Sequence, residues 1–193
     1  MDSLKKERYK RQIQMPEIGI EGQNLLAEKK VLIIGAGGLG TPCAAYLSGA
    51  GIGHIEILDD DNVSLSNLPR QILYSVNDIG RPKAEVLSEK LRLSNPLIDI
   101  VPTIKRLTPE NAIDAIKGFD VVASCVDNQE TRYLLNHACV DCEIPLVDGA
   151  VSGFTGIIFS FASNKGPCYR CLFPDQEVQV KKSSIIGPAA GVI

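Results

Sequence analysis

The order of apolar and polar residues along the chain predicts alternating strands and helices. Four apolar residues, Val31 to Ile34, run directly into a glycine-rich turn, and alanine, leucine and tyrosine then recur at helical spacing from Leu39 to Gly51. A second strand is expected over His54 to Leu58, where three acidic residues end it. From Asn62 to Gly80 the pattern is mostly irregular, and a loop of that length in a compact domain is usually functional.

The same alternation continues through the second half of the chain. After Pro82, the side chains of Ala84, Leu87 and Leu91 share one face of an amphipathic helix that should end near Leu93. Strands are then predicted over residues 98–104, 120–125, 144–147 and 154–161, with helices over 109–117 and 129–142. Strands that alternate with helices predict an α/β fold with a doubly wound, Rossmann-like and mostly parallel sheet, which binds ligands at the carboxyl ends of its strands.

The length of 193 residues predicts a single domain with a substantial core. We divide it into an N-terminal arm (residues 1–30), a nucleotide-binding core (31–150) and a C-terminal segment (151–193). The last segment is expected to hold an antiparallel, meander-like strand and a cysteine-bearing knuckle.

The glycine-rich turn after the first strand has the spacing of a nucleotide-phosphate site. Gly35 permits a tight turn, and Gly37 and Gly38 let the backbone approach phosphate oxygens. Gly40 lets the next helix pack closely against its strand, and the backbone N–H groups at the helix start then face the anion. A turn that serves only packing is the alternative, but the strand–turn–helix context favours a nucleotide.

An acidic residue at the end of the second strand predicts a ribose contact. Asp59 lies about twenty residues beyond the glycines, where a carboxylate commonly accepts hydrogen bonds from ribose hydroxyls. That position alone favours NAD, so a nicotinamide oxidoreductase is one hypothesis. Hydride transfer also needs a proton donor or acceptor, and neither His54, at a turn, nor His137, inside a helix, is well placed for that role.

The following loops favour a triphosphate instead. Arg70, Arg81 and Lys83 bring two guanidinium groups and an ammonium group just past the ribose acid, and one turn of backbone amides does not neutralise a triphosphate. Asp127 ends a buried strand, where a magnesium ligand would face the phosphates. Each residue also has an ordinary interpretation: Arg70 as a solvated loop residue, and Asp127 as the N-cap of the helix from Gln129. Their positions at successive strand ends favour the site.

Composition narrows the possible partners. Twenty Lys and Arg against 23 Asp and Glu give a net charge of −3, so bulk charge offers no attraction to nucleic acid. No apolar window approaches membrane-spanning length, and the basic N-terminal start has no apolar run after it, so we expect neither a signal peptide nor a membrane anchor. Four of the six cysteines fall in C-x-x-C pairs, which suit metal or redox chemistry in a reducing compartment, and we expect a cytoplasmic protein.

Taken together, these motifs resemble the ThiF/MoeB/HesA family, bacterial relatives of the ubiquitin-activating enzymes. The matching segments are collinear over nearly the whole chain: RYKRQI (8–13), GAGGLG (35–40), ILDDDNVSLSNLPRQ (57–71), GRPK (80–83), CVDN (125–128) and CYRC (168–171). The resemblance implies an adenylyltransferase that uses ATP to activate the C-terminal glycine of a small ubiquitin-like sulfur carrier protein. It favours the carrier of thiamine biosynthesis, with the molybdopterin carrier or a truncated, non-catalytic binding module as alternatives.

The resemblance also implies roles for individual residues. Gly38 would lie against the phosphates and Asp59 on the ribose, while Asp127 would hold Mg²⁺ with Asn128 nearby. The triphosphate would be contacted by Asn67, Arg70 and Lys83. Arg11 would reach the triphosphate of the opposite protomer, which implies a homodimer. Pro69 stands where relatives commonly carry a polar residue, a change that we expect a loop to tolerate.

The cysteines predict an incomplete zinc site. Cys168 and Cys171 have the spacing of a zinc knuckle. The resemblance implies that this pair shares Zn²⁺ with a second C-x-x-C, and no cysteine follows Cys171, so we expect the chain to be shortened relative to the family and to bind zinc weakly. An alternative site would combine the knuckle with Cys139 and Cys142. The segment 178–188, where relatives with a reactive cysteine carry it, contains none, which puts sulfur transfer there in doubt.

Overall fold

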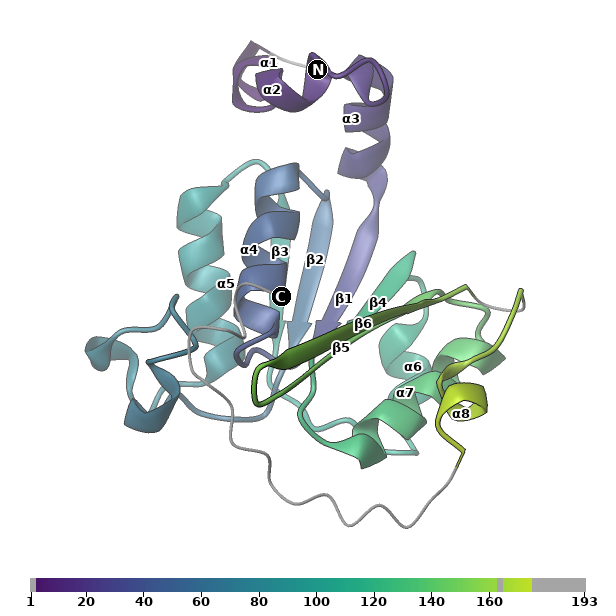
Figure 1. Ribbon diagram of the computed structural model, residues 1–193. Helices are drawn as coiled ribbons and strands as arrows, with labels where there is room; N and C mark the ends of the chain where they lie inside the picture. Colours follow the sequence, from purple (N-terminus) through teal and green to yellow (C-terminus); the bar gives the residue numbers. More distant parts are fainter. Residues whose placement is uncertain (1–2, 163–164, 175–193) are drawn as a thin grey trace.

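A computed structural model of the chain describes residues 3–162 and 165–174, which form one six-stranded sheet in the order β3-β2-β1-β4-β5-β6 (Figure 1). The first five strands in chain order are parallel, and β6 runs antiparallel to β5. This confirms the predicted doubly wound sheet with an antiparallel extension. The strands are β1 (Lys30–Ile34), β2 (His54–Leu58), β3 (Asp99–Thr103), β4 (Val121–Ser124), β5 (Leu146–Ser152) and β6 (Thr155–Phe161).

Helices cover both faces of the sheet, and β1 shows why the sequence permits this. Val31 and Ile33 are buried in one core cluster, and Leu32 and Ile34 in the other. Because successive side chains of a strand point to opposite faces, a strand that is buried on both sides is an unbroken apolar run. The first face packs against α4 (Gly40–Ala50) and α5 (Lys83–Ser94), and the second against α6 (Ala112–Ile116) and α7 (Gln129–Asp141) (Figure 1). Within the described ranges, no helix has the length and apolar character needed to cross a membrane.

The sheet reverses its winding between β1 and β4. The strand β1 pairs with β2 on one side and with β4 on the other, and the helices change face at this point. Connections therefore leave the carboxyl ends of β1 and β4 in opposite directions, which opens a crevice there. The fold thus places the candidate site at the carboxyl ends of the central strands.

Two predicted boundaries differ from the structure by three residues or more. The strand expected over 144–147 extends to Ser152, because a tight turn at Gly153 lets β6 pair with it as far as the Ser152–Thr155 register. The polar, glycine-containing sequence of this segment conceals the strand, since the pairing partner stabilises it. The helix expected over 109–117 begins only at Ala112, because the Asn111 side chain accepts a hydrogen bond from the Thr108 N–H (3.0 Å) and holds a turn there.

The N-terminal arm forms three helices that the sequence pattern did not predict: α1 (Ser3–Arg8), α2 (Lys10–Ile13) and α3 (Gly19–Glu28). The Gln12 and Gln23 side chains donate to the Ala50 carbonyl at 3.0 and 2.9 Å, and Asn95 donates to the Tyr9 hydroxyl at 3.0 Å. These partners lie at the last turn of α4 and just beyond α5. The arm therefore lies at the amino ends of the strands, opposite the crevice (Figure 1).

The long loop between β2 and α5 is anchored by one buried carboxylate. It contains two short 3-10 helices, η1 (Leu65–Asn67) and η2 (Val76–Asp78). Asp78 accepts hydrogen bonds from the Ser75 N–H and hydroxyl, both at 2.7 Å, and pairs with Lys90 of α5. Burial by itself would raise the pKa of Asp78, but the hydrogen bonds from Lys90 and Ser75 outweigh it and lower the pKa to about 2. The irregular loop is thereby fixed to the helix behind it.

We expect Asp78→Asn to lower the free energy of unfolding by about 2 kcal/mol at pH 7, because it removes the charge that Lys90 and Ser75 stabilise. The folded pKa of Asp78 lies below its ordinary value of 3.8, so this stabilisation is complete above that value and is lost as the pH falls toward 2. Urea unfolding at pH 7 and pH 3 should show a smaller difference between wild type and variant at pH 3. The control Asp114→Asn removes an exposed acid of α6 and should cost little. Equal destabilisation by Asp78→Asn at both pH values would contradict this account.

Candidate nucleotide site

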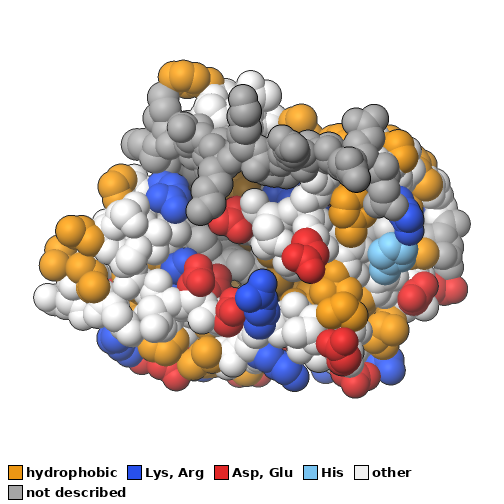
Figure 2. All heavy atoms as spheres, turned by 90° about the horizontal axis from the view of Figure 1, so that it is seen from below, with side chains coloured by type: hydrophobic (Ala, Val, Ile, Leu, Met, Phe, Trp, Pro, Cys, Tyr) orange, Lys and Arg blue, Asp and Glu red, His pale blue; other side chains and the backbone are white. Residues whose placement is uncertain are grey.

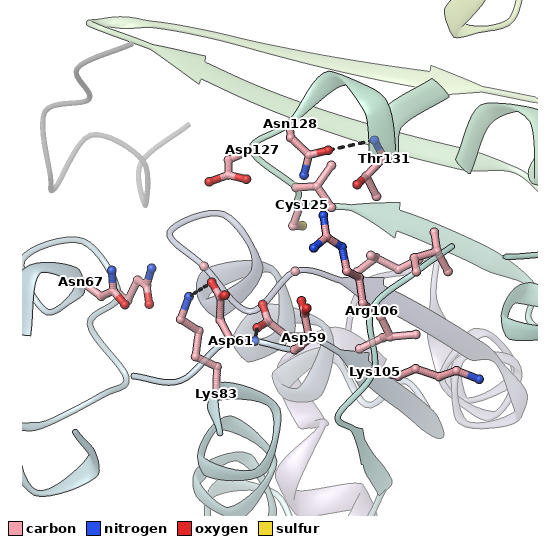
Figure 3. A pocket seen from close by; sticks show the side chains of 18 of the residues that line it. Asp59, Asp61, Asn67, Lys83, Lys105, Arg106, Cys125, Asp127, Asn128 and Thr131 are labelled. Atoms are coloured by element: carbon pink, nitrogen blue, oxygen red, sulfur yellow. Dashed lines mark hydrogen bonds and ion pairs between the residues drawn. The ribbon is translucent and has the colours of Figure 1, made fainter. Parts of the chain in front are cut away.

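A cavity of about 400 Å³ lies at the carboxyl ends of β1, β2 and β4, where the reversal of the sheet predicts a ligand (Figure 3). Acidic and basic side chains lie beside one another on this face of the molecule (Figure 2). Eight residues singled out in the sequence line the cavity: Gly35, Gly37, Asp59, Asn67, Arg70, Lys83, Asp127 and Asn128. The structure therefore brings together residues that are up to 93 positions apart, from Gly35 to Asn128.

The glycine turn is packed too tightly for side chains at two positions. Gly35 has a φ of +97°, and a Cβ there would lie 2.7 Å from the Cys125 carbonyl oxygen. A Cβ on Gly40 would lie 1.8 Å from the carbonyl oxygen of Gly35 itself. Gly38 and Gly40 do not line the cavity. Two N–H groups of the turn already have protein partners, since Gly35 donates to the Leu58 carbonyl (2.9 Å) and Ala36 to Asp59 (2.6 Å). Charged side chains must therefore supplement the turn in binding phosphates.

Asp59 connects the glycine turn to the loop after β2. Its two carboxylate oxygens accept hydrogen bonds from the Ala36 N–H at 2.6 Å and the Asp61 N–H at 2.8 Å. Burial raises the pKa of Asp59, and these two hydrogen bonds together with the nearby Lys83 ammonium only partly offset it. Each carboxylate oxygen keeps further acceptor capacity, so the group is able to receive ribose hydroxyls.

Lys83 enters the cavity as one half of an ion pair. Its side chain is only 6% exposed, and its Nζ lies 2.7 Å from an oxygen of Asp61, which is 70% exposed (Figure 3). Tyr74 donates to the Ala36 carbonyl at 2.8 Å and lies 3.3 Å from the Lys83 carbonyl. This buried hydroxyl links the glycine turn to the start of α5. Sequence reasoning missed Tyr74, because an aromatic residue in an irregular loop carries no motif.

The loop after β2 also supplies Asn67 and Arg70. Asn67 accepts from the Ser64 N–H (3.3 Å) and closes the short helix η1, and Arg70 donates to the Ser66 carbonyl (3.1 Å). Both side chains are half-buried and line the cavity, so Arg70 is more than a solvated loop residue. The loop therefore presents one amide and one guanidinium group to the site.

Asp127 and Asn128 follow β4, and one of them caps helix α7 while the other faces the cavity. The N-cap of α7 is Asn128, whose side chain accepts from the Thr131 N–H at 2.9 Å (Figure 3). The alternative assignment of Asp127 as the N-cap is therefore wrong. Asp127 lines the cavity, is exposed and has no hydrogen bond or ion pair among the described residues. Its carboxylate is available to a ligand or a metal ion.

Two basic residues of the cavity were missed in the sequence. Lys105 and Arg106 follow β3, whose carboxyl end lies at the same edge of the sheet. In Figure 3 the Arg106 side chain points toward Asn128 and Thr131, whereas Lys105 points away from the other labelled residues. Leu107, the next residue, supplies apolar surface together with Leu58 and Val126. The strand-end rule that selected Asp59 and Asp127 also applies here and was not extended to β3.

Arg11 and the two histidines lie away from this cavity. Arg11 is exposed on α2, in the arm at the amino ends of the strands. His54 contacts Asp99 (2.7 Å), and His137 contacts Arg170 (3.3 Å). None of the three lines the cavity, so the described chain offers no histidine for proton transfer beside a bound nucleotide.

The cysteine knuckle has the geometry of half a zinc site. Cys168 is the N-cap of the short helix α8 (Tyr169–Leu172) and Cys171 lies within that helix, with the two sulfur atoms 3.7 Å apart. Two corners of a tetrahedron with Zn–S distances of about 2.3 Å are about 3.8 Å apart, so the pair fits this metal. Among the described residues, no group of three or more His, Cys, Asp or Glu forms a metal site. The alternative four-cysteine site is thus not formed there, and burial raises the pKa of Cys139 to about 12, which keeps that thiol neutral.

The topology and the cavity define a Rossmann-like α/β protein with a candidate nucleotide site, whose lining combines the glycine turn with cationic side chains. The chain belongs to the ThiF family, which matches residues 9–193. This confirms the family that the motifs predicted. Segment 178–188 and the rest of 175–193 lie outside the described residues.

Individual relatives agree with this family. Over 191 residues the chain is 44% identical to the sulfur carrier protein ThiS adenylyltransferase of Escherichia coli, which covers 96% of this chain and 76% of that protein. It is 42% identical to the adenylyltransferase and sulfurtransferase UBA4 of Yarrowia lipolytica, again over 96% of this chain but only 48% of the relative. The chain therefore spans only part of each of these proteins.

Solved structures share the fold. A crystal structure of Escherichia coli MccB with MccA-N7isoASN matches with a TM-score of 0.84 at 23% identity, covering 96% of this chain and 60% of that one. The Escherichia coli tRNA N6-threonylcarbamoyladenosine dehydratase TcdA, in a complex with ATP, matches with a TM-score of 0.74 at 28% identity, covering 79% and 63%. The first similarity shows the fold, and the second is to a structure whose nucleotide is ATP.

Proposed function

We propose that this protein uses ATP to adenylylate the C-terminal glycine of a small ubiquitin-like sulfur carrier protein. The observation that carries the proposal is the composition of one cavity: it is lined by a ribose-type acid, Asp59, by the cations Arg70 and Lys83, and by Asp127, whose carboxylate is unpaired among the described residues. A dinucleotide needs no such set of cations, whereas a triphosphate does. The names of the relatives, which are sulfur carrier adenylyltransferases, support the same activity.

The proposed reaction needs no nucleophilic side chain. A carboxylate oxygen of the carrier's terminal glycine attacks the α-phosphorus of ATP and forms the acyl phosphate bond. The bond from that phosphorus to the bridging oxygen breaks, and pyrophosphate leaves with the electron pair. Negative charge grows on the leaving oxygens, so the chain's task is to hold cations there before the reaction begins. Arg70 and Lys83 are the candidate cations, and the neutral Asn67 amide is a candidate hydrogen-bond donor, because all three line the cavity.

Asp127 fits the part of a magnesium ligand. Mg²⁺ usually binds proteins through one or two carboxylates and takes its other ligands from phosphates and water. Asp127 supplies one exposed carboxylate, and Asn128 beside it is committed to the cap of α7. The bound metal would add charge stabilisation at the phosphates. The glycine turn would supply backbone contacts to the phosphates, with Gly35 and Gly37 lining the cavity and Gly38 next to them in the turn.

The oligomer and the zinc site belong to the proposal as well. Arg11 is on the side of the molecule opposite the cavity, so it reaches a triphosphate only in another protomer, and we propose a homodimer that places it there. Cys168 and Cys171 would supply two thiolates to Zn²⁺. Two thiolates alone hold the metal weakly.

We place the protein in the reducing cytoplasm, where its six cysteines stay as thiols.

The proposal also names the carrier protein that is adenylylated. We favour the thiamine carrier, and the molybdopterin carrier is the alternative. The adenylyltransferase and sulfurtransferase MOCS3 of Aedes aegypti is also 44% identical, so sequence identity does not favour the ThiS adenylyltransferase over this relative. Recognition of a carrier protein uses a surface rather than a short motif, and it needs a direct assay.

Exchange of labelled pyrophosphate into ATP tests the function. With the purified protein, Mg²⁺ and the cognate carrier, exchange should be at least a hundredfold faster than with the same carrier lacking its terminal glycine, because that carboxylate is the attacking group. Parallel assays with the thiamine and molybdopterin carriers identify the pathway by their kcat/KM values. Saturable calorimetric binding of NAD without any response to ATP would overturn the assignment. ATP binding without exchange for any carrier would reduce the protein to a binding module.

A further inference from the structure

A buried ion pair lies directly behind the loop that carries Asp127. Arg132 of α7 is 8% exposed and pairs with Asp148 of β5, which is 1% exposed. The Arg132 guanidinium also donates to the Val126 carbonyl at 2.6 Å and to the Gly149 carbonyl at 2.9 Å. On its other oxygen, Asp148 accepts from the Ser124 hydroxyl at 2.6 Å. One guanidinium thus connects β5, α7 and the end of β4.

The contacts of Arg132 lie next to Asp127 in the chain. Val126 is the residue immediately before Asp127, and its carbonyl accepts from Arg132. On the other side, Asn128 is fixed by its cap on α7, and Cys125 donates its N–H to the Ile34 carbonyl at 2.8 Å. The backbone is therefore held on both sides of Asp127, whose own side chain has no partner among residues 3–162 and 165–174. A free carboxylate on a fixed backbone is prepared to meet a ligand.

Stability alone is a poor reason for this arrangement. Desolvating two charges commonly costs about as much as their attraction returns, so a well-packed apolar pair often serves the fold equally well. What an apolar pair lacks is the planar set of donors that binds a carboxylate and two carbonyls at once. That set of donors is the feature that specifies the path of the backbone through Val126.

We propose that Arg132, held by Asp148, is a positioning residue that sets the Asp127 carboxylate for Mg²⁺–ATP. Arg132 lies behind the cavity rather than among its lining residues, and it acts through the Val126 carbonyl. The inference rests on the proposed role of Asp127 in the nucleotide site. It predicts that Arg132 influences how ATP binding depends on Mg²⁺, a property separate from the overall stability of the fold.

The test uses Arg132→Lys, which keeps the charge opposite Asp148 but loses the planar fork of donors. ATP binding is measured by calorimetric titration at a series of Mg²⁺ concentrations. In Arg132→Lys, the Mg²⁺ concentration that gives half-maximal enhancement of ATP binding should be about tenfold higher than in wild type. The ATP affinity in EDTA should stay within about twofold of wild type, because only the placement of Asp127 changes. The matched control is Tyr133→Phe, the next residue of α7, which loses its own 2.7 Å hydrogen bond to the Phe173 carbonyl. It should leave the Mg²⁺ dependence unchanged. An equal shift in Tyr133→Phe, or none in Arg132→Lys, overturns the proposal.

A double-mutant cycle separates this inference from the proposed function. In an Asp127→Ala background, Arg132→Lys should cause no further change in Mg²⁺ dependence, because the group that it positions is gone. A further shift of the same size would overturn the proposal.

The Mg²⁺ titration needs no carrier, so absence of exchange with every carrier would defeat the adenylylation proposal and leave this result standing. If Arg132→Lys does not fold, the apolar replacement Arg132→Met with Asp148→Leu should fold and show the same weakened Mg²⁺ dependence. A folded Arg132→Met, Asp148→Leu variant with wild-type Mg²⁺ dependence would overturn the proposal.

Discussion

Asp127→Ala is expected to slow carrier-dependent pyrophosphate exchange by a hundredfold or more while the protein stays folded. The side chain is exposed and has no partner among the described residues, so its removal leaves no buried group unsatisfied. At the phosphates, by contrast, it deletes the proposed metal ligand, and losses of about 2.7 kcal/mol or more in transition-state stabilisation are usual for such a group. Exchange kinetics at saturating ATP, with circular dichroism to verify the fold, measure both parts.

The matched control for Asp127→Ala is Glu130→Ala. Glu130 is an exposed acid three residues further on, in the first turn of α7, and it does not line the cavity. This variant changes the net charge equally and should retain near-normal exchange. If a folded Asp127→Ala protein also exchanged at a near-normal rate, magnesium would have to be assigned to another residue.

Gly40→Ala is expected to abolish ATP binding and to destabilise the domain by about 3 kcal/mol or more, the range of severe core overpacking. The added Cβ would lie 1.8 Å from the Gly35 carbonyl oxygen and 2.8 Å from its carbon, and both atoms belong to the backbone of the turn. The start of α4 and the glycine turn would have to separate, which moves the N–H groups that are proposed to face the nucleotide. Thermal unfolding and calorimetric titration with ATP measure the two effects.

Gly49→Ala provides the control within the same helix. A Cβ at Gly49 meets no atom within 4 Å, and alanine favours a helix over glycine by about 1 kcal/mol. This variant should keep its ATP affinity and gain slightly in stability. Comparable losses in the Gly40 and Gly49 variants would show that α4 is sensitive to any substitution, and would remove the close approach of Gly40 as the cause.

The local pattern of apolar and polar residues was sufficient to predict most strands and helices of the core. Strand β1 lies where the apolar run Val31 to Ile34 predicted it, and α5 begins directly after Pro82. Both signals are local: a strand buried on two faces needs a continuous apolar run, and a proline suits the start of a helix. The N-terminal arm gave no such signal. Its helices are held through side chains such as Gln12 and Asn95 that bond to distant elements, and these bonds leave no periodicity in the sequence.

The candidate site divides in the same way. The residues that would touch the nucleotide, such as Asp59 and Asp127, are recognisable because they stand at strand ends, and a parallel sheet brings all of its carboxyl ends to one edge. The residues that support them are not recognisable in this manner. Tyr74 donates to the carbonyl of Ala36, which is distant in the sequence, and Arg132 donates to the carbonyl of Val126. No sequence motif indicates that either carbonyl has a side-chain partner.

Sequence alone therefore determined the family, the order of the core elements and eight of the residues that line one cavity. Tertiary structure decided which of their polar groups are already used. The Ala36 N–H and the Lys83 ammonium bind protein carboxylates, Asn128 caps a helix, and Asp127 keeps its carboxylate unpaired within the described residues. The physical reason is that hydrogen-bond satisfaction depends on distances between atoms, whereas the sequence records only which donors and acceptors exist.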